Sequence, residues 1–167
     1  MSAETAVARP GTESAPNPLR RALGHMATSV TLVTTRHGET DHGFTANSFA
    51  AVSADPALVT VFLAETAECY GVFAETDRIA VNILADGQEE LALRFATRGA
   101  DKFGALVQDP EHPGVPGVVG AMASIVGRVH ERWSVGDHLM IIIAVDEVVY
   151  AGHEPLVYHN RAFRKLV

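Results

Sequence analysis

The side chains best suited to hold a polar ligand lie together in residues 43–53. Hydroxyl and amide groups come from Thr45, Asn47, Ser48 and Ser53. The small residues among them are Gly43, Ala46, Ala50 and Ala51, which would let the backbone come close to a guest. Converging N–H and hydroxyl groups can hold a phosphate or the edge of a polar heterocycle. The same residue types also suit a loop that crosses between two strands, so the residues alone leave both interpretations open.

Three further residues could take part in chemistry, and each has a purely structural alternative. His138 follows Gly136-Asp137 and precedes an apolar run, which would place an imidazole at the end of a strand or simply in an exposed turn. Lys102 could neutralise a phosphate or be a solvated surface lysine. Cys69, the single cysteine, suits a small buried apolar position.

Short helices are expected at three places. Asn17-Pro18 is a strong helix start, and that helix should run to about Ala27 with Leu19, Leu23 and Met26 packed against a sheet. A second helix should begin at Thr66 as N-cap and end before Asp77. A third should run through Phe95, with a capping-box arrangement between Asp86 and Glu89.

Strands dominate the remaining pattern. Apolar or alternating runs occupy residues 30–35, 57–63, 79–84, 118–133, 139–145 and 155–158. The run at 57–63 is nearly continuous and predicts a strand buried on both faces, and Gly127 predicts a bend in the long strand 118–133. Residues 37–41 predict a hairpin connection that enters the next strand near His42, and residues 108–117 predict a loop. Closely spaced strands with few helices indicate an antiparallel β-barrel.

Composition excludes several classes of function. A net charge of −7 argues against nucleic acid or an anionic membrane as partner. No apolar run is long enough to cross a bilayer and no signal peptide is visible, so a cytoplasmic location is expected, in line with the single cysteine. The histidines lack metal-ligand spacing, so no metal is expected, and a Rossmann GxGxxG motif is absent. Residues 1–16 are predicted to form a disordered arm before a single domain, residues 17–167.

Several of these segments together resemble the short-chain flavin reductases, which use NAD(P)H to supply reduced flavin to two-component monooxygenases. The resemblance extends from about Leu19 to Leu166 and depends on the order and spacing of its pieces. They are Gly43-Phe44-Thr45-Ala46-Asn47-Ser48-Phe49, Val52-Ser53, Asp55-Pro56-Ala57-Leu58-Val59, Arg94-Phe95-Ala96, Asp101-Lys102-Phe103, Gly136-Asp137-His138 and Tyr158-His159. The resemblance implies a mainly β fold, an antiparallel split β-barrel of the Greek-key, FMN-binding type with a few short peripheral helices. It also implies a homodimer, an FAD or FMN ligand, NADH or NADPH as hydride donor, and a separate flavin-dependent monooxygenase as partner.

The resemblance further implies roles for individual residues. It places His138 near the nicotinamide, where it positions the ring and helps to protonate reduced flavin. The flavin ring and its side chain would meet Thr45, Ala46, Asn47, Ser48 and Ser53. Cys69 stands where the family commonly has Ser near the flavin phosphate, beside the acidic Glu68, and a thiol is a poor phosphate donor. The remaining binding residues implied are Phe95, Ala96, Lys102 and Phe103 for phosphate or adenine, and Tyr158, His159 and Arg161 for the pyridine nucleotide.

Two other functions fit the sequence. One is a flavoenzyme like the pyridoxamine-phosphate oxidases, which needs more Arg and Lys residues for its phosphates than the middle of this chain provides. The other is a non-catalytic flavin-binding module. The choice between FAD and FMN stays open at this point, and so does the choice between a tightly held and a diffusible flavin. The few basic residues favour NADH over NADPH.

Overall fold

The computed structural model describes residues 17–103 and 114–166. The predicted arm at residues 1–16 lies outside this part of the chain, as does most of the predicted loop at 108–117.

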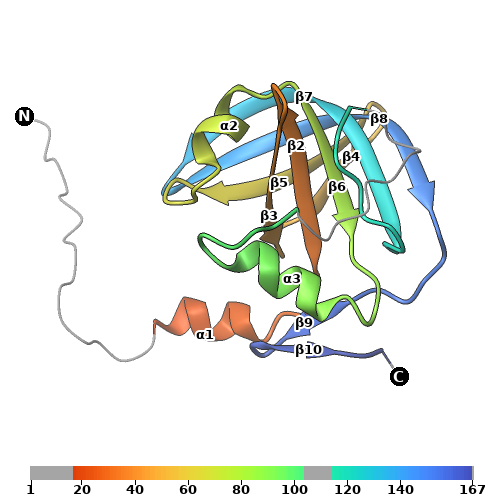
Figure 1. Cartoon of the computed structure of the whole chain (residues 1–167). Coiled ribbons are helices and arrows are strands. Elements are labelled where there is room, and N and C mark those ends of the chain that lie inside the picture. Colours follow the sequence, from red (N-terminus) through yellow and green to blue (C-terminus); the bar gives the residue numbers. More distant parts are fainter. Residues whose placement is uncertain (1–16, 104–113, 167) are drawn as a thin grey trace, which may run out of the picture.

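The described chain is built around one antiparallel sheet of seven strands in the order β3-β2-β6-β7-β8-β5-β4. Figure 1 shows these strands curving around a shared interior. Their bounds are β2 Thr31–His37, β3 Thr40–Ala46, β4 Ala50–Ala54, β5 Ala57–Ala64, β6 Arg78–Ile83, β7 Ala123–Val135 and β8 His138–Tyr150. The antiparallel barrel predicted from strand spacing is therefore confirmed, and so is the β2–β3 hairpin.

A second, three-stranded sheet packs below the barrel in Figure 1, in the order β1-β9-β10. Its strands are β1 Thr28–Ser29, β9 Val157–His159 and β10 Ala162–Arg164. The prediction gave one last strand at 155–158 and missed β10. Pro155 makes only an isolated bridge to Ala85, because proline has no N–H to donate to a ladder.

The first helix, α1 (Pro18–Gly24), begins as predicted and differs in its packing. The Asn17 side chain accepts a hydrogen bond from the Leu19 N–H at 2.9 Å, which confirms the N-cap. The helix ends at Gly24 rather than Ala27. Leu19, Leu23 and Met26 are 63%, 53% and 56% exposed, so the predicted packing of this face on a sheet of the same chain is wrong.

The starts of the other two helices also differ from prediction. Helix α2 covers Tyr70–Glu75, because residues 66–68 form a turn in which Thr66 supplies no helix cap. Helix α3 covers Glu89–Ala96 and is preceded by Gln88 without a side-chain cap. The predicted capping box is absent because Asp86 instead forms an ion pair with Lys165, at 2.8 Å.

Two apolar clusters hold these layers together. The barrel interior is filled from β2, β3, β5, β6, β8 and α2, and Phe73 of α2 is fully buried there. A second cluster joins α3 to β2 and the small sheet through Phe95, Leu32 and Tyr158. Strand β5 is buried on both faces at Val59–Val61, as predicted. The apolar strand β8 has buried and partly exposed residues in alternation, as expected for an antiparallel sheet with one covered face.

The bend predicted at Gly127 is confirmed. The β7–β8 register shifts between Val126 and Gly127, so the bulged backbone passes close to β8. A Cβ on Gly127 would overlap the carbonyl oxygen of Ala144 and lie 2.7 Å from Ile143 Cγ2. Only glycine fits this position.

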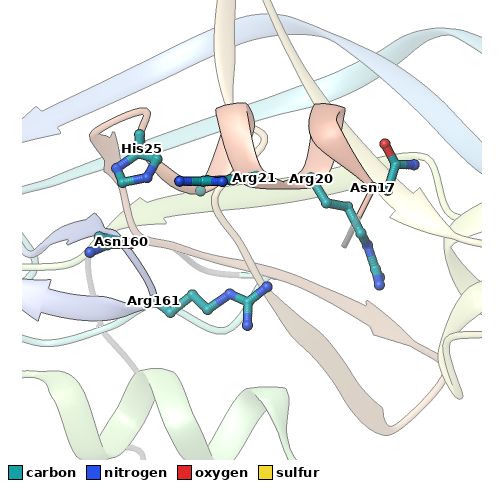
Figure 2. A pocket seen from close by; sticks show the side chains of 7 residues that line it. Asn17, Arg20, Arg21, His25, Asn160 and Arg161 are labelled. Atoms are coloured by element: carbon teal, nitrogen blue, oxygen red, sulfur yellow. The ribbon is translucent and has the colours of Figure 1, made fainter. Parts of the chain in front are cut away.

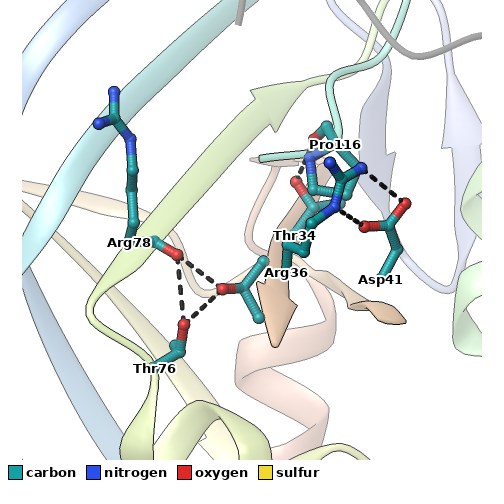
Figure 3. Close-up of polar contacts among 7 residues, drawn as sticks. Thr34, Arg36, Asp41, Thr76, Arg78 and Pro116 are labelled. Atoms are coloured by element: carbon teal, nitrogen blue, oxygen red, sulfur yellow. Dashed lines mark hydrogen bonds and ion pairs between the residues drawn. The ribbon is translucent and has the colours of Figure 1, made fainter. Parts of the chain in front are cut away.

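Buried hydroxyl groups fix the end of β2 to its neighbours, as Figure 3 shows. Thr35 Oγ1 donates to the Arg78 carbonyl at 2.6 Å and lies 2.5 Å from Thr76 Oγ1. Arg36 and Asp41 pair across the β2–β3 hairpin at 2.6 Å, which raises the pKa of the Arg36 guanidinium through the hydrogen bond to Asp41 and its charge. The Arg36–Asp41 pair holds β2 and β3 in register beside their hairpin turn.

Candidate functional site

A cavity of about 370 Å³ opens where the ends of β3 and β5 approach each other. Its volume lies within the usual range for small-molecule sites. The walls come from the β3–β4 connection, the end of β5, the turn before α2, the end of α3 and the start of β8. The predicted site residues that line it are Thr45, Ala46, Asn47, Ser48, Cys69, Phe95, Ala96, Lys102 and His138.

Among residues 45–48, two polar side chains form hydrogen bonds within the protein and one is left for a ligand. Thr45 Oγ1 donates to the Ala92 carbonyl at 2.6 Å, which ties β3 to α3. Ser48 Oγ exchanges hydrogen bonds with the backbone N–H and C=O of Phe62, both at 3.2 Å, which ties the connection to β5. Asn47 is exposed, and its amide has no such bond within the described residues. Asn47 is therefore the side-chain donor most available to a ligand.

The small residues of this stretch have other uses than the predicted close approach to a guest. Gly43 makes room for Phe95 of α3, since a Cβ there would lie 2.8 Å from Phe95 Cε1. Ala50 and Ala51 are exposed on β4 and line none of the described cavities. Only Ala46, which is 7% exposed, faces the cavity as expected.

His138 lines the same cavity from the first position of β8. Its Nδ1 lies 2.6 Å from Asp137 Oδ1. A carboxylate accepts hydrogen bonds, so Nδ1 carries the proton and Nε2 is the nitrogen left for a ligand. The hydrogen bond with His138 is the main cause that lowers the pKa of the Asp137 carboxyl below its usual value. The Asp137 carboxylate therefore orients the imidazole from the solvent side, where it is itself 92% exposed.

Positive charge gathers at the end formed by the turns around α2 and α3. Arg98 and Lys102 both line the cavity there. Arg98 donates from Nη2 to the Thr66 carbonyl, and Lys102 Nζ lies 4.0 Å from Glu68 Oε2. Burial raises the pKa of the Cys69 thiol, against a smaller lowering by Lys102, so the thiol is neutral at neutral pH. Cys69 forms part of the wall and of the barrel core.

The aromatic residues at this end are mainly packing groups. Phe95 is 1% exposed and meets Phe103 edge to face, with ring centroids 5.1 Å apart. Phe103 lines a neighbouring hollow of about 240 Å³, which shares Glu68, Cys69 and Lys102 with the main cavity. Stacking of either ring on an adenine stays a prediction.

Comparison with known proteins decides the family. A family model described as "Flavin reductase like domain" matches residues 23–167. The chain belongs to this family.

Two relatives illustrate the similarity of this flavin reductase-like chain to known proteins. It is 40% identical over 152 residues to "Actinorhodin polyketide dimerase" of Streptomyces coelicolor, covering 89% of this chain and 85% of the relative. It is 37% identical over 157 residues to "NADH-dependent flavin reductase" of Rhodococcus sp, covering 92% and 88%.

Solved structures agree with the fold. "Flavin reductase PheA2 in native state" matches with a TM-score of 0.83 and 31% identity, over 92% of this chain and 99% of that one. "Streptomyces globisporus C-1027 NADH:FAD oxidoreductase SgcE6 in complex with NAD and FAD fragments" gives a TM-score of 0.83 and 31% identity, over 89% and 91%. The match confirms the split-barrel fold that the resemblance implied.

Some predicted residues of the flavin reductase-like chain lie away from this cavity. Ser53 sits on β4 next to a register shift and faces none of the described cavities. Tyr158 packs edge-on against Phe163, and His159 lies near His25, with ring centroids 6.3 Å apart. The contact of Ser53 with flavin and the contacts of Tyr158 and His159 with a pyridine nucleotide stay predictions.

Arg161 lies in a different, basic cleft of about 610 Å³ between α1 and the β9–β10 turn. Figure 2 shows Arg161 below the helix that carries Arg20 and Arg21, with His25 at its end. Asn160 and Arg161 both have positive φ, at 50° and 60°, as in a tight hairpin turn. Within one chain this cleft does not share a lining residue with the cavity that contains His138.

Sequence reasoning missed Arg98 and the end of β5, where Phe62, Leu63 and Ala64 line the cavity. A signal for Arg98 was present, since it follows the expected end of α3 and stands shortly before Asp101-Lys102-Phe103. Within the described residues, no cluster of three or more His, Cys, Asp or Glu could hold a metal. No helix in that part of the chain has both the length and the apolar character needed to span a bilayer.

Proposed function

We propose that this protein is an NADH-dependent flavin reductase that supplies free reduced flavin to a separate monooxygenase. The observation that carries the proposal is the cavity that joins Asn47 and His138 to a cationic end, in a chain of the flavin reductase-like family. Relatives named "NADH-dependent flavin reductase" and "FMN reductase (NADH)", and the reductase component of a Thermus thermophilus 4-hydroxyphenylacetate 3-monooxygenase, support it.

The residues of the cavity fit a planar ring with an anionic tail. The walls are largely small or apolar, Asn47 and His138 offer polar side chains, and Arg98 and Lys102 supply positive charge. A flavin held here would supply the ring that accepts a hydride from a reduced nicotinamide. The protein has to orient the two rings and exclude water, and it needs no catalytic triad for this.

Individual roles follow from the contacts. Asn47 donates to or accepts from the polar edge of the flavin ring. His138 positions the nicotinamide through Nε2, while Asp137 holds the imidazole in one tautomer. Lys102 and Arg98 neutralise the flavin phosphate.

Besides the separate monooxygenase, the proposal includes a second copy of this chain in a homodimer. Leu19 and Leu23 of α1, with Met26 just after the helix, form an exposed apolar surface that the described chain leaves uncovered. Light scattering on the wild-type protein is expected to give a dimer, and Leu23→Glu is expected to weaken it. Leu93→Glu, at an exposed leucine of α3, is the matched control. A wild-type monomer would contradict this part of the proposal. A cytoplasmic location also belongs to the proposal.

Steady-state kinetics test the function directly. NADH and NADPH are crossed with FAD, FMN and riboflavin, and nicotinamide oxidation is followed by absorbance. The proposal expects a rate that saturates in added flavin, with NADH preferred, and anaerobic bleaching of the flavin. His138→Ala is expected to lower kcat/KM for NADH by about 10- to 100-fold, and the exposed His153→Ala is the control. A rate independent of added flavin would refute the release of free flavin and indicate a tightly held flavin, whereas absence of both NADH oxidation and bleaching would favour a non-catalytic module.

A further inference from the structure

One acidic residue, Glu68, sits at the cationic end of the cavity and contacts the groups suited to a phosphate. Glu68 lines both the main cavity and the neighbouring hollow. Its Oε2 accepts a hydrogen bond from the Gly99 N–H at 3.2 Å and lies 4.0 Å from Lys102 Nζ. One carboxylate oxygen therefore meets a backbone donor and an ammonium from the segment after α3.

These contacts connect two segments that face each other across the cavity. Residues 66–68 come from the turn before α2, and residues 98–102 follow α3. Beside the Glu68 contacts, Arg98 donates to the Thr66 carbonyl. Both cations of this end are thus in contact with the turn at residues 66–68 when no ligand is bound.

Burial makes the Glu68–Lys102 contact more important than an ordinary surface pair. The Lys102 side chain is only 16% exposed, and that of Glu68 is 48% exposed. Charges near a partly buried site are screened less than charges in open solvent. A phosphate that approaches Lys102 meets the like charge of Glu68 and has to compete with it for the ammonium group.

We propose that Glu68 sets how tightly the site holds a phosphorylated flavin, by competing with the phosphate for Lys102 and repelling it. This inference rests on the proposed function and assigns a specificity-determining role to Glu68. The Glu68 carboxylate holds residues 66–68 and 98–102 together in the free protein. It also lowers the affinity for the phosphate, so reduced flavin leaves the site readily. The ring end of the ligand is unaffected, because Glu68 contacts only the cationic end.

The substitution Glu68→Gln tests this with little structural change. Glutamine keeps an oxygen that accepts the Gly99 N–H and removes the negative charge. Glu65→Gln is the matched control, because Glu65 lies in the same turn, is exposed and does not line the cavity. Binding of FMN, FAD and riboflavin is measured by flavin fluorescence, with a thermal melt to confirm folding.

The expected result is an affinity for FMN about three- to tenfold higher in Glu68→Gln than in the wild type. Riboflavin, which has no phosphate, should bind both proteins equally, and Glu65→Gln should behave as wild type. The gain should become smaller when Lys102→Gln is added, because the competition for the ammonium group is then removed and only the direct repulsion by Glu68 remains.

Two outcomes would overturn the inference. Unchanged or weaker FMN binding in Glu68→Gln would show that the carboxylate does not oppose the phosphate. Equal tightening of riboflavin and FMN would show that the variant acts through the shape of the loop. In either case, flavin-dependent NADH oxidation by the wild type would leave the proposed function standing, whereas failure of every flavin to bind the wild type would remove both.

Discussion

Gly43→Ala should destabilise the protein and disturb the wall of the cavity. The new Cβ would lie 2.8 Å from Phe95 Cε1, 3.0 Å from the Val33 carbonyl oxygen and 3.2 Å from Phe95 Cδ1. The Phe95 ring has little room to withdraw, because it is 1% exposed and packs edge-on against Phe103. Overpacking of this kind costs about 1–3 kcal/mol, and each kcal/mol lowers Tm by about 2–4 °C in a domain of this size.

The assay is a thermal melt followed by circular dichroism, together with a flavin titration. Flavin binding should weaken as well, because Phe95 and Ala96 form part of the cavity wall. Gly71→Ala is the control, since Gly71 is exposed in α2 with nothing within 4 Å of the new Cβ, and it should be neutral or stabilising by up to about 1 kcal/mol. Adding Phe95→Leu to Gly43→Ala should cost less than the sum of the two single changes. A wild-type Tm for Gly43→Ala, or strict additivity with Phe95→Leu, would refute the reasoning.

Three further predictions concern the bulge, the polar stretch and the Asp137–His138 turn. Gly127→Ala should cost about 3 kcal/mol or more, because its Cβ overlaps the Ala144 carbonyl oxygen of β8, and an unchanged denaturant midpoint would contradict this. Asn47→Ala should weaken flavin binding by about 0.5–1.5 kcal/mol and leave Tm unchanged. Ser48→Ala should instead lower Tm, because the hydrogen bonds to the Phe62 backbone are lost. A lower Tm for Asn47→Ala and an unchanged Tm for Ser48→Ala would be evidence against these assignments. The lowered pKa of Asp137 means that its contribution to stability is present above about pH 4, near the ordinary Asp value, and is lost as pH falls through the lowered pKa. The Tm difference between wild type and Asp137→Asn should therefore narrow as pH falls below about 4, and a difference that grows over this acid range would be inconsistent with this sign.

The sequence predicted most strands of the large sheet, because their signals are local, but β1, β4 and β10 were not predicted, and β7 begins at Ala123 rather than at Val118. The alternation in residues 118–133, Gly127 within it and the Gly136-Asp137 turn all report on backbone geometry near their own positions. The helix boundaries were less accurate, because Asp86 and Thr66 have partners elsewhere in the fold. Asp86 forms an ion pair with Lys165, and the Thr66 carbonyl accepts a hydrogen bond from Arg98.

The site was predicted in location more than in the use of each side chain. Asn47, Lys102 and His138 line one cavity, and their roles toward flavin and nicotinamide stay predictions. The pattern could not reveal that the Thr45 and Ser48 hydroxyls bond to Ala92 and Phe62, because those partners are set by three-dimensional packing. The exposure of Leu19 and Leu23 could not be predicted either, because an apolar helix face has the same sequence pattern whether its own chain or another chain covers it.

The order of the large sheet has a consequence for the protein without its ligand. β3 and β4 are the two outermost strands, joined through residues 47–49, so each has one edge with no neighbouring strand in the described chain. A molecule seated at this seam would shield main-chain amides that no ladder protects. Amide hydrogen exchange around residues 44–48 should accordingly be the fastest part of the barrel wall in the free protein and slow down most when FMN is added.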